Sequence, residues 1–320
     1  MNILFFDLRD SEQEYFRKNK FGDMDITFFK EAVSDNIKLS DEEYEETDVI
    51  SIHQNSVLTE KFLKKFHNLR MVALRSNIAN NVDTEYCTAH KIAVIHIEEF
   101  GAEASAEYVL GLLIMLVRNI LPSAIDIKNK NIDYGVYEGK NLKNYVLGII
   151  GCNKSGIRLA KMLKNSGLKI LVHSYMKNPE LCDCEFVSFD ELLNKSDVIS
   201  FHTPYTGDNK HLLAQKEFDK MKSGSYVINI ADGNLIDTKA LYENITNGKI
   251  RGAAIDTLEC ELNDKNCENL IWQDKLINLK NVIVTPHLSV NTADVSEQVL
   301  TELFHSIKDF YKGLYVNRLC

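Results

Sequence analysis

The stretch LGIIGCNKSGIRLAKMLKNSG, residues 147–167, decides how the chain folds. It starts as an apolar run that predicts a buried strand ending at Gly151, and a helix is predicted to open near Ser155. Gly156 stands where a helix and a strand would pack closely, and Gly167 ends the helix. In such a turn, backbone N–H groups and a helix amino terminus can meet the pyrophosphate of a dinucleotide.

The turn departs from the pattern G-x-G-x-x-G at its middle glycine, which is Asn153. Asparagine tolerates left-handed backbone angles, but its side chain stands where a pyrophosphate would approach. Two interpretations therefore stay open, a dinucleotide-binding loop and a tight strand–helix turn without a ligand. The candidate cofactor-binding residues of the loop are Gly151, Asn153, Lys154, Ser155 and Gly156.

Short apolar runs alternate with helical patterns on both sides of the loop. Before it, strands are predicted at residues 2–7, 24–29, 48–53, 71–76 and 93–97. From the loop onward, strands are predicted at 145–151, 169–174, 198–203, 226–230, 253–258 and 282–286. Apolar strands separated by helices indicate parallel sheets covered on both faces. The predicted fold class is α/β, with two doubly wound parallel-sheet domains.

One long helix is predicted over residues 102–121. It is apolar nearly all round, which is typical of a buried helix or one at a subunit interface. Its apolar run at 109–117 is too short to span a bilayer.

Composition narrows the function further. The 320 residues are enough for two domains, and the net charge of -9 argues against nucleic acid or an anionic membrane as a partner. The amino terminus has no basic region or cleavage site. The seven cysteines lack metal-ligand spacing, because Cys182 and Cys184 have no second pair, so no metal is expected. The expectation is a reduced, cytoplasmic protein.

The end of the second strand after the loop bears on the choice of cofactor. An acid there would bind the ribose 2′-hydroxyl of NAD. The chain has Ser174 instead, with Lys177 three residues later. The pattern leans toward NADP, and the choice between NAD and NADP stays open.

Several segments together resemble the D-isomer-specific 2-hydroxyacid dehydrogenases, and most of all the bacterial D-lactate dehydrogenases, including the type linked to vancomycin resistance. Besides the glycine loop, the segments are LRSNIANNVDT (74–84), EFGAEASAEYVLGLLI (99–114), FDELLNKSDVISFHTPYT (189–206), MKSGSYVINIADGNLIDTKAL (221–241), GKIRGAAIDTLECE (248–261) and NVIVTPHLS (281–289). They follow the family's order and cover most of the chain from residue 70 onward.

The resemblance implies a discontinuous architecture. A flavodoxin-like catalytic domain would comprise residues 1–98 and 291–320, and a dinucleotide-binding domain residues 99–290. The helix from Ala102 would build a homodimer, and the active site would take a small carbonyl or hydroxy-acid substrate.

The resemblance also assigns roles. His287 matches the family's acid–base histidine, which donates and regains the proton of the reacting carbonyl. Glu261 matches the carboxylate that pairs with this histidine and stabilises its charged form. The remaining cofactor-side candidates are Ser174, His202, Thr203, Pro204 and Asp256.

Several ligand-facing positions depart from the family. Where the family has the arginine that binds the substrate carboxylate, in N-T-x-R-G, this chain has Asp232. Ile78 replaces a glycine whose neighbouring N–H groups help to bind that carboxylate. Phe100 stands where relatives often have a tyrosine. The candidate substrate-binding residues are Arg75, Asn77, Ile78 and Phe100, and Asp232 joins the catalytic set.

The effect of Asp232 can be bounded. One charge pair at about 4 Å in an effective dielectric near 20 is worth ~4 kcal/mol, so attraction turned into repulsion amounts to at most ~8 kcal/mol. This upper bound is roughly the whole binding free energy of a ligand with a micromolar dissociation constant. Two hypotheses follow: an oxidoreductase with weakened or altered 2-oxo acid specificity, and a non-catalytic dinucleotide-binding protein that acts as a sensor or assembly partner.

Overall fold

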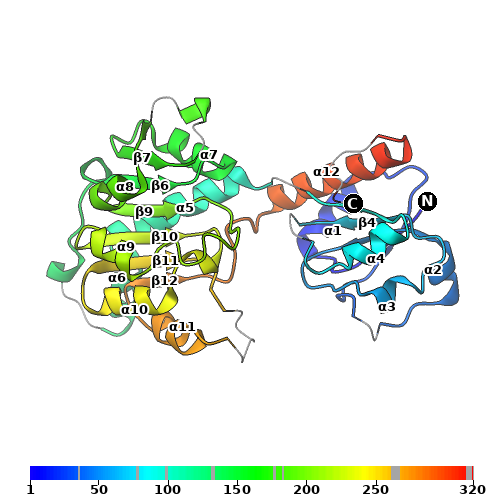
Figure 1. The fold of residues 1–320 in the computed structure, drawn as a ribbon, viewed down its shortest axis with the longest axis horizontal. Helices are drawn as coiled ribbons and strands as arrows, with labels where there is room; N and C mark the ends of the chain where they lie inside the picture. Colours follow the sequence, from blue (N-terminus) through cyan, green and yellow to red (C-terminus); the bar gives the residue numbers. More distant parts are fainter. Residues whose placement is uncertain are drawn as a thin grey trace. The chain divides into compact units, whose positions relative to one another are not determined.

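The computed structural model describes residues 1–34, 37–76, 79–97, 100–130, 134–175, 178–181, 184–260, 267–314 and 319. The chain forms two compact units (Figure 1). The smaller unit comprises Met1–Phe100 and Asn291–Cys320, and the larger unit comprises Gly101–Val290.

The smaller unit contains a five-stranded parallel sheet in the order β2-β1-β3-β4-β5. Its strands are β1 (Asn2–Phe5), β2 (Asp25–Phe28), β3 (Thr47–Ile52), β4 (Met71–Leu74) and β5 (Ala93–Ile95). The central strands are almost entirely buried because their apolar side chains are covered on both faces. The order reverses between β1 and β3, which makes this point the topological switch of the sheet.

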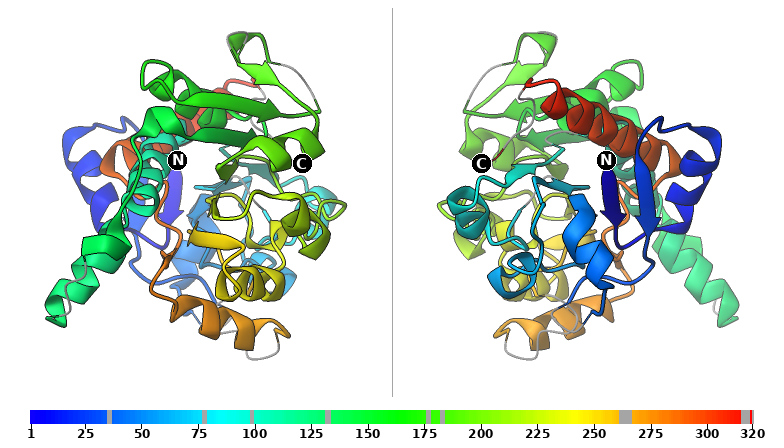
Figure 2. Two further views of the ribbon diagram at one scale, coloured as in Figure 1. Left: turned by 90° about the vertical axis from the view of Figure 1, so that its left-hand side faces the viewer. Right: turned by 90° about the vertical axis from the view of Figure 1, so that its right-hand side faces the viewer.

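Helices from both ends of the chain cover the smaller sheet. They are α1 (Asp10–Lys18), α2 (Asp41–Glu46), α3 (Glu60–Leu63), α4 (Thr84–Ala89) and α12 (Ala293–Tyr311). Helix α12 packs on α1 (Figure 2, red helix). There Phe304 makes ring contacts with Tyr15, Phe16 and Phe21, so the last helix completes the core that the first hundred residues begin.

The larger unit contains a seven-stranded parallel sheet in the order β12-β11-β10-β9-β6-β7-β8. Its strands are β6 (Val146–Ile150), β7 (Lys169–His173), β8 (Glu185–Phe186), β9 (Val198–Phe201), β10 (Ser225–Asn229), β11 (Ile250–Ile255) and β12 (Val282–Val284). The order reverses between β6 and β9, so the carboxyl ends of these two strands flank the switch point.

Helices cover the larger sheet as well. They are α5 (Ala102–Val117), α6 (Ile120–Lys128), α7 (Lys154–Leu163), α8 (Phe189–Lys195), α9 (Gln215–Lys220), α10 (Thr238–Thr246) and α11 (Leu270–Ile277). Short 3-10 helices are η1 (Tyr134–Tyr137), η2 (Leu142–Asn144), η3 (Pro179–Leu181) and η4 (Gly233–Leu235). Ser188 and Asp237 begin α8 and α10 by accepting hydrogen bonds from first-turn N–H groups.

The α/β class with two parallel sheets is confirmed. The single helix predicted over 102–121 is wrong at its end: α5 stops at Val117, and Asn119, with a φ of +50°, starts α6 in a new direction. Within the described ranges, no single helix is long and apolar enough to cross a membrane. The α5–α6 pair, bent by 61°, meets that test by length and composition only.

Candidate active site

The glycine loop lies directly against the end of β9. Gly151 turns the chain from β6 into α7 with a φ of +105°, and a Cβ atom there would lie 2.2 Å from the carbonyl oxygen of His202. A Cβ added to Gly156 would lie 3.1 Å from Cβ of the same histidine. The first position therefore admits only glycine, and the strand–helix turn has the close packing expected of a dinucleotide loop.

Asn153, in the place of the middle glycine, is the N-cap of α7. Its side-chain oxygen accepts hydrogen bonds from the N–H of Gly156 at 3.0 Å and from Oγ of Ser155 at 2.9 Å. The cap satisfies a donor that a pyrophosphate would otherwise use. Lys154 follows on the first turn with an exposed side chain. A bound pyrophosphate must displace the cap or use other N–H groups of this turn.

His202 supports the loop from inside the larger unit. The side chain is buried, with Nδ1 2.8 Å from Oγ of Ser155 and Nε2 2.9 Å from Oγ of Ser200. Burial lowers the pKa of His202 to about 4, so the ring is neutral near pH 7. The sequence placed His202 among the cofactor-facing residues, but the structure uses both of its ring nitrogens within the unit.

The other candidates of the cofactor side share the edge of the sheet that carries the glycine loop. Ser174 follows β7, and Thr203 and Pro204 follow β9, the two strands that flank β6. Ser174 and Thr203 are half-buried and Pro204 is exposed. Ligands of doubly wound sheets bind at this carboxyl edge, beside the switch point.

The loop after β10 is built around Asp232. Its Oδ1 accepts hydrogen bonds from the backbone N–H of Asn234 at 2.8 Å and from Nδ2 of the same residue at 3.0 Å. The side chain of Asn229 donates to the carbonyl oxygen of Asp232 at 2.9 Å. The acid thus caps η4, a local role that an arginine could not fill because it has no acceptor.

Asp256 holds the loop that carries His287. The Asp256 carboxylate is 1% exposed and accepts hydrogen bonds from Oγ1 of Thr285 (2.6 Å) and the N–H groups of Leu288 (2.8 Å) and Ser289 (2.9 Å). His287 is exposed, and its backbone is left-handed, with a φ of +56°. Such a backbone at a non-glycine residue costs about 1 kcal/mol and is concentrated at functional sites. Asp256, expected on the cofactor side, thus positions the His287 loop.

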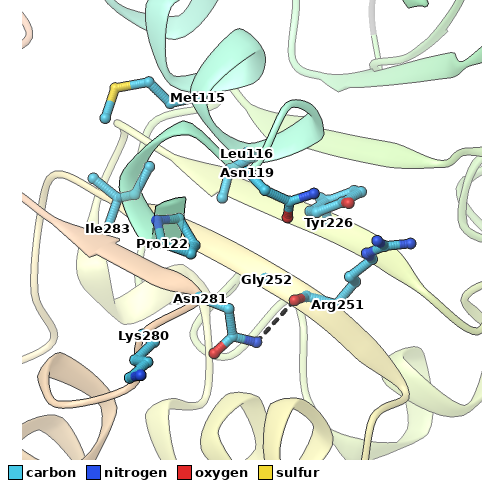
Figure 3. A pocket seen from close by; sticks show the side chains of 10 residues that line it. All are labelled: Met115, Leu116, Asn119, Pro122, Tyr226, Arg251, Gly252, Lys280, Asn281 and Ile283. Atoms are coloured by element: carbon cyan, nitrogen blue, oxygen red, sulfur yellow. Dashed lines mark hydrogen bonds between the residues drawn. The ribbon is translucent and has the colours of Figure 1, made fainter. Parts of the chain in front are cut away.

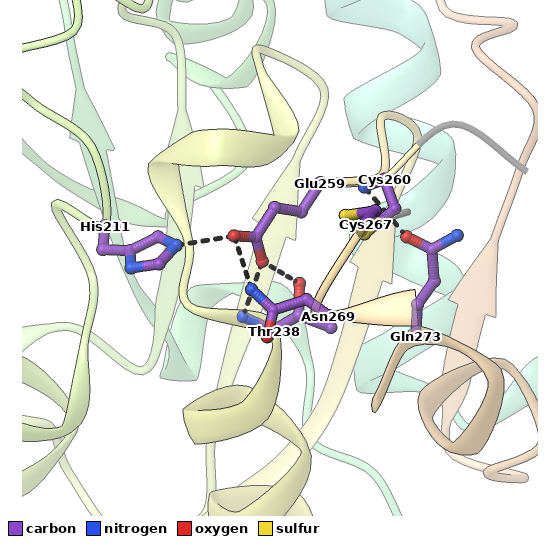
Figure 4. Close-up of a disulfide and its surroundings, with 7 residues drawn as sticks. All are labelled: His211, Thr238, Glu259, Cys260, Cys267, Asn269 and Gln273. Atoms are coloured by element: carbon purple, nitrogen blue, oxygen red, sulfur yellow. Dashed lines mark hydrogen bonds and ion pairs between the residues drawn. A yellow bond between two sulfur atoms is a disulfide. The ribbon is translucent and has the colours of Figure 1, made fainter. Parts of the chain in front are cut away.

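Glu261 lies outside the described residues, but Glu259 beside it is well fixed (Figure 4). The Glu259 carboxylate accepts hydrogen bonds from Nε2 of His211 (2.7 Å), Oγ1 of Thr238 (2.6 Å) and Nδ2 of Asn269 (2.8 Å). Burial would raise the pKa of Glu259, but these hydrogen bonds lower it below its ordinary value. No spacing in the sequence signals this anchor, because its members are far apart in the chain.

A disulfide closes the segment that contains Glu261. Cys260 and Cys267 are joined, with their Cα atoms 5.8 Å apart, and the N–H of Cys260 donates to Oε1 of the buried Gln273 at 3.1 Å (Figure 4). The expectation that all cysteines are reduced is wrong for this pair. The spacing of the cysteines in the sequence does not by itself reveal this pair.

Reduction of the disulfide should destabilise the larger unit. Opening a loop of this length restores about 2.5 kcal/mol of chain entropy to the unfolded state. That corresponds to a fall of roughly 5 °C in melting temperature, to be measured calorimetrically with and without dithiothreitol. Cys267→Ser should melt at the lower temperature in both conditions, while Cys152→Ser should keep the reductant-dependent shift. Equal melting of oxidised and reduced wild type would contradict a formed disulfide.

In the smaller unit, Arg75 follows β4 but turns inward and is 1% exposed. Its guanidinium donates to Oγ of Ser51 (2.9 Å) and the carbonyl oxygen of Asp7 (3.2 Å), and lies 3.7 Å from the ring centroid of Phe5. Its Nε is 2.9 Å from Oε1 of Glu12, an ion pair without hydrogen-bond geometry. Burial lowers the pKa of Arg75 to about 10, so it stays charged. This candidate for the substrate cation is used inside the smaller unit.

The structure describes only one of the other three substrate candidates. Asn77 and Ile78 lie outside the described residues, and Phe100 is half-buried at the end of the smaller unit. Among the residues that the structure describes, no group of three or more His, Cys, Asp or Glu side chains could hold a metal ion.

A small hollow opens on the opposite edge of the larger sheet (Figure 3). It lies among Met115 and Pro122 of α5 and α6 and the first residues of β10 and β11, where the carbonyl oxygen of Arg251 accepts from Asn281 at 2.8 Å. Because it lies at the amino ends of the strands, it is separate from the candidate active site.

Comparison with known proteins points to one family. Residues 110–289 match the D-isomer specific 2-hydroxyacid dehydrogenase, NAD binding domain. The chain belongs to this dehydrogenase family.

Individual relatives agree with this assignment. A hydroxypyruvate reductase from Thermotoga maritima is 30% identical over 82% of this chain and 84% of its own length. The D-lactate dehydrogenase of Aquifex aeolicus, solved with NAD and lactic acid, is 29% identical with a TM-score of 0.81 and covers 98% of this chain and 96% of its own. A D-lactate dehydrogenase from Treponema pallidum has the same fold, with a TM-score of 0.91 at 23% identity over 100% of both chains.

This dehydrogenase is therefore an oxidoreductase related to the D-2-hydroxyacid dehydrogenases, and its larger unit is an NAD(P)-binding domain. The glycine loop fits that cofactor because a Cβ at Gly151 is excluded and the loop is packed against β9. Bound there, the nicotinamide cofactor supplies or takes up a hydride.

Proposed function

We propose that this dehydrogenase interconverts a carbonyl compound and its alcohol with NAD(H) or NADP(H), and that simple 2-oxo acids are poor substrates. The observation that carries the proposal is the Asp232 carboxylate, fixed by Asn234 in a packed loop at the carboxyl end of β10. A carboxylate ligand that approached it would be repelled by up to ~4 kcal/mol. The half-exposed side chain admits some solvent screening.

Two substrate classes suit such a loop. One is a carbonyl compound without a carboxylate beside the reacting carbon, and the other carries an amine that pairs with Asp232. The second class is supported by Oδ2 of Asp232, which has no partner among the described residues, whereas Oδ1 is occupied by Asn234. His287 would donate the proton, and Glu261 would pair with it.

A homodimer built on the helix from Ala102 is part of the same proposal. Supporting it, Ile114 of α5 and Ile120 and Ile127 of α6 leave large apolar side chains exposed. The reduced, cytoplasmic setting expected from the sequence would not favour the Cys260–Cys267 disulfide.

The alternative is a non-catalytic dinucleotide-binding protein, a sensor or assembly partner. Asn153 favours it, because its side chain already caps the helix that a pyrophosphate would meet. The exposed, left-handed His287 favours the enzyme, since a strained histidine has no evident use in a mere binder.

Cofactor binding and turnover separate these possibilities. We expect calorimetry to give a dissociation constant for NADH or NADPH between about 1 μM and 1 mM, the usual range of enzyme KM values. Turnover would then be followed with pyruvate, aromatic 2-oxo acids, amino-bearing oxo acids and simple ketones. Binding of neither cofactor would exclude both the enzyme and the sensor. Brisk turnover of pyruvate would show that Asp232 does not exclude 2-oxo acids.

A further inference from the structure

The loop after β10, residues 230–237 and here called the Asp232 loop, packs against the loop after β11. A Cβ atom added to Gly233 would lie 2.5 Å from the backbone nitrogen of Glu259. The Oγ1 hydroxyl of Thr257 donates to the carbonyl oxygen of Ala231 at 2.7 Å. The two backbones are therefore in direct contact, and a shift of one loop must displace the other because close-packed atoms leave no room between them.

The Glu259 side chain holds the surroundings of the Asp232 loop at two further points. Its Oε1 lies 2.7 Å from Nε2 of His211, and the backbone N–H of His211 donates to the carbonyl oxygen of Asn234 at 2.7 Å. Its Oε2 accepts from Oγ1 of Thr238, the first residue of α10, at 2.6 Å. His211 has a left-handed backbone, with a φ of +53°, which persists only where neighbouring contacts fix it. Glu259 thus fixes both the segment that pairs with the Asp232 loop and the helix that follows it.

The Cys260–Cys267 disulfide joins two chain segments that meet at the Glu259 carboxylate (Figure 4). Cys260 follows Glu259 directly, and Cys267 stands two residues before Asn269, whose Nδ2 donates to Oε1 of Glu259 at 2.8 Å. The N–H of Cys260 also donates to Oε1 of Gln273 at 3.1 Å. Breaking the covalent link leaves hydrogen bonds, which are individually weak, to keep Asn269 against Glu259.

Reduction of this disulfide is an exchange with a dithiol. Cys260 is 2% exposed and Cys267 is half-buried, so a thiolate of the dithiol reaches Cys267 more easily. The Sγ–Sγ bond breaks as a mixed disulfide forms on Cys267, and the second thiolate of the dithiol then releases the cysteine. The two cysteines gain two electrons and two protons, and the dithiol becomes a cyclic disulfide.

We propose that the Cys260–Cys267 disulfide controls the Asp232 loop through Glu259, which acts as a positioning residue. The oxidised pair keeps Asn269 on the carboxylate, and reduction by a dithiol loosens first this contact and then the loop. The inference rests on the proposed function and deepens it, because this loop carries the acid that we expect to select the substrate. The oxidation state of the two cysteines then sets how well the loop is preorganised for the carbonyl substrate.

Amide hydrogen exchange in the full-length protein, without substrate or cofactor, tests the coupling. Reduction with dithiothreitol should speed exchange of the N–H groups of His211 and Asn234 by about 10-fold, the range for one lost hydrogen bond. The N–H of Gly156 is the matched control, because a side-chain oxygen, that of Asn153, also caps it. It should exchange equally fast in both states, whereas a general loss of stability would speed it as well.

Three variants separate the disulfide from its link to the loop. Cys267→Ser should show the faster exchange with and without dithiothreitol. Glu259→Gln keeps the shape of the side chain but removes its charge, so it should exchange faster when oxidised and lose most of the response to dithiothreitol. Cys184→Ser changes a cysteine outside the disulfide and should respond like the wild type.

Turnover connects the loop to the reaction. For the best carbonyl substrate, reduction should raise KM by about 2- to 10-fold with little change in kcat, as expected when binding alone is weakened. The dissociation constant of the cofactor should stay the same. Equal exchange at His211 and Asn234 in the two states, equal acceleration at Gly156, or an unchanged KM overturns the control. Absence of turnover with either cofactor instead removes the proposed function, and the exchange result still decides whether the disulfide controls the loop.

Discussion

The His287→Asn variant should turn over the best carbonyl substrate about a thousandfold more slowly than the wild type. General acid–base catalysis by a positioned histidine typically contributes 10² to 10⁴-fold, and asparagine cannot exchange a proton near neutral pH. Asparagine tolerates the left-handed backbone found at this position, so the loop held by Asp256 should persist. Stopped-flow measurement of NADH oxidation gives the rate of the chemical step directly.

Two controls give the result its meaning. NADH affinity of His287→Asn should equal that of the wild type, because the histidine is assigned to the proton and not to the cofactor. His67→Asn, at an exposed position of the smaller unit, should leave the rate unchanged. A His287→Asn rate within about threefold of the wild type would remove the histidine from the reaction and favour the non-catalytic alternative.

Asp232→Arg should raise kcat/KM for pyruvate by about 100-fold or more. The upper bound for replacing repulsion by attraction is ~8 kcal/mol, and a hundredfold gain uses about 2.7 kcal/mol of it. We expect the smaller value because Asp232 is partly exposed and because the new side chain also loses the hydrogen bonds to Asn234. Steady-state kinetics would compare kcat/KM for pyruvate with kcat/KM for an amino-bearing oxo acid. The variant should favour pyruvate more than the wild type does.

Asp232→Asn is the matched variant for this experiment. It removes the charge but keeps the side-chain oxygen that caps η4, so its pyruvate kinetics should fall between those of the wild type and Asp232→Arg on a logarithmic scale. Its stability should match the wild type, whereas Asp232→Arg should lose about 1 kcal/mol with the cap. No gain for either variant would mean that Asp232 does not face the substrate, or that the approach past Ile78 is closed.

Much of the fold could be predicted because parallel strands in covered sheets are continuous apolar runs. Runs such as 48–53 and 198–203 coincide with β3 and β9. The strand β8 was not predicted, because two residues are too few to show a hydrophobic pattern. The bend at Asn119 was not predicted, because α5 and α6 are both apolar and their sequences resemble one continuous helix.

The candidate site was less predictable because sequence shows which residues follow a strand but not where their side chains turn. Arg75, His202 and Asp256 all follow strands, yet all three are buried and engaged in hydrogen bonds. Each has partners from other segments, and those contacts exist only in the folded chain. For Asp232, the sequence showed that an acid replaces the family's arginine. It did not show that the Asp232 side chain caps η4.

The placement of α12 constrains how the protein matures during synthesis. The larger unit, Gly101–Val290, is continuous in the chain, but the smaller unit needs residues from Asn291 onward. Until Phe304 has left the ribosome, Tyr15, Phe16 and Phe21 lack a ring that completes their cluster. The segment translated first is therefore the one that must wait longest for its native partners, and it is the stretch that a nascent-chain chaperone would have to shield.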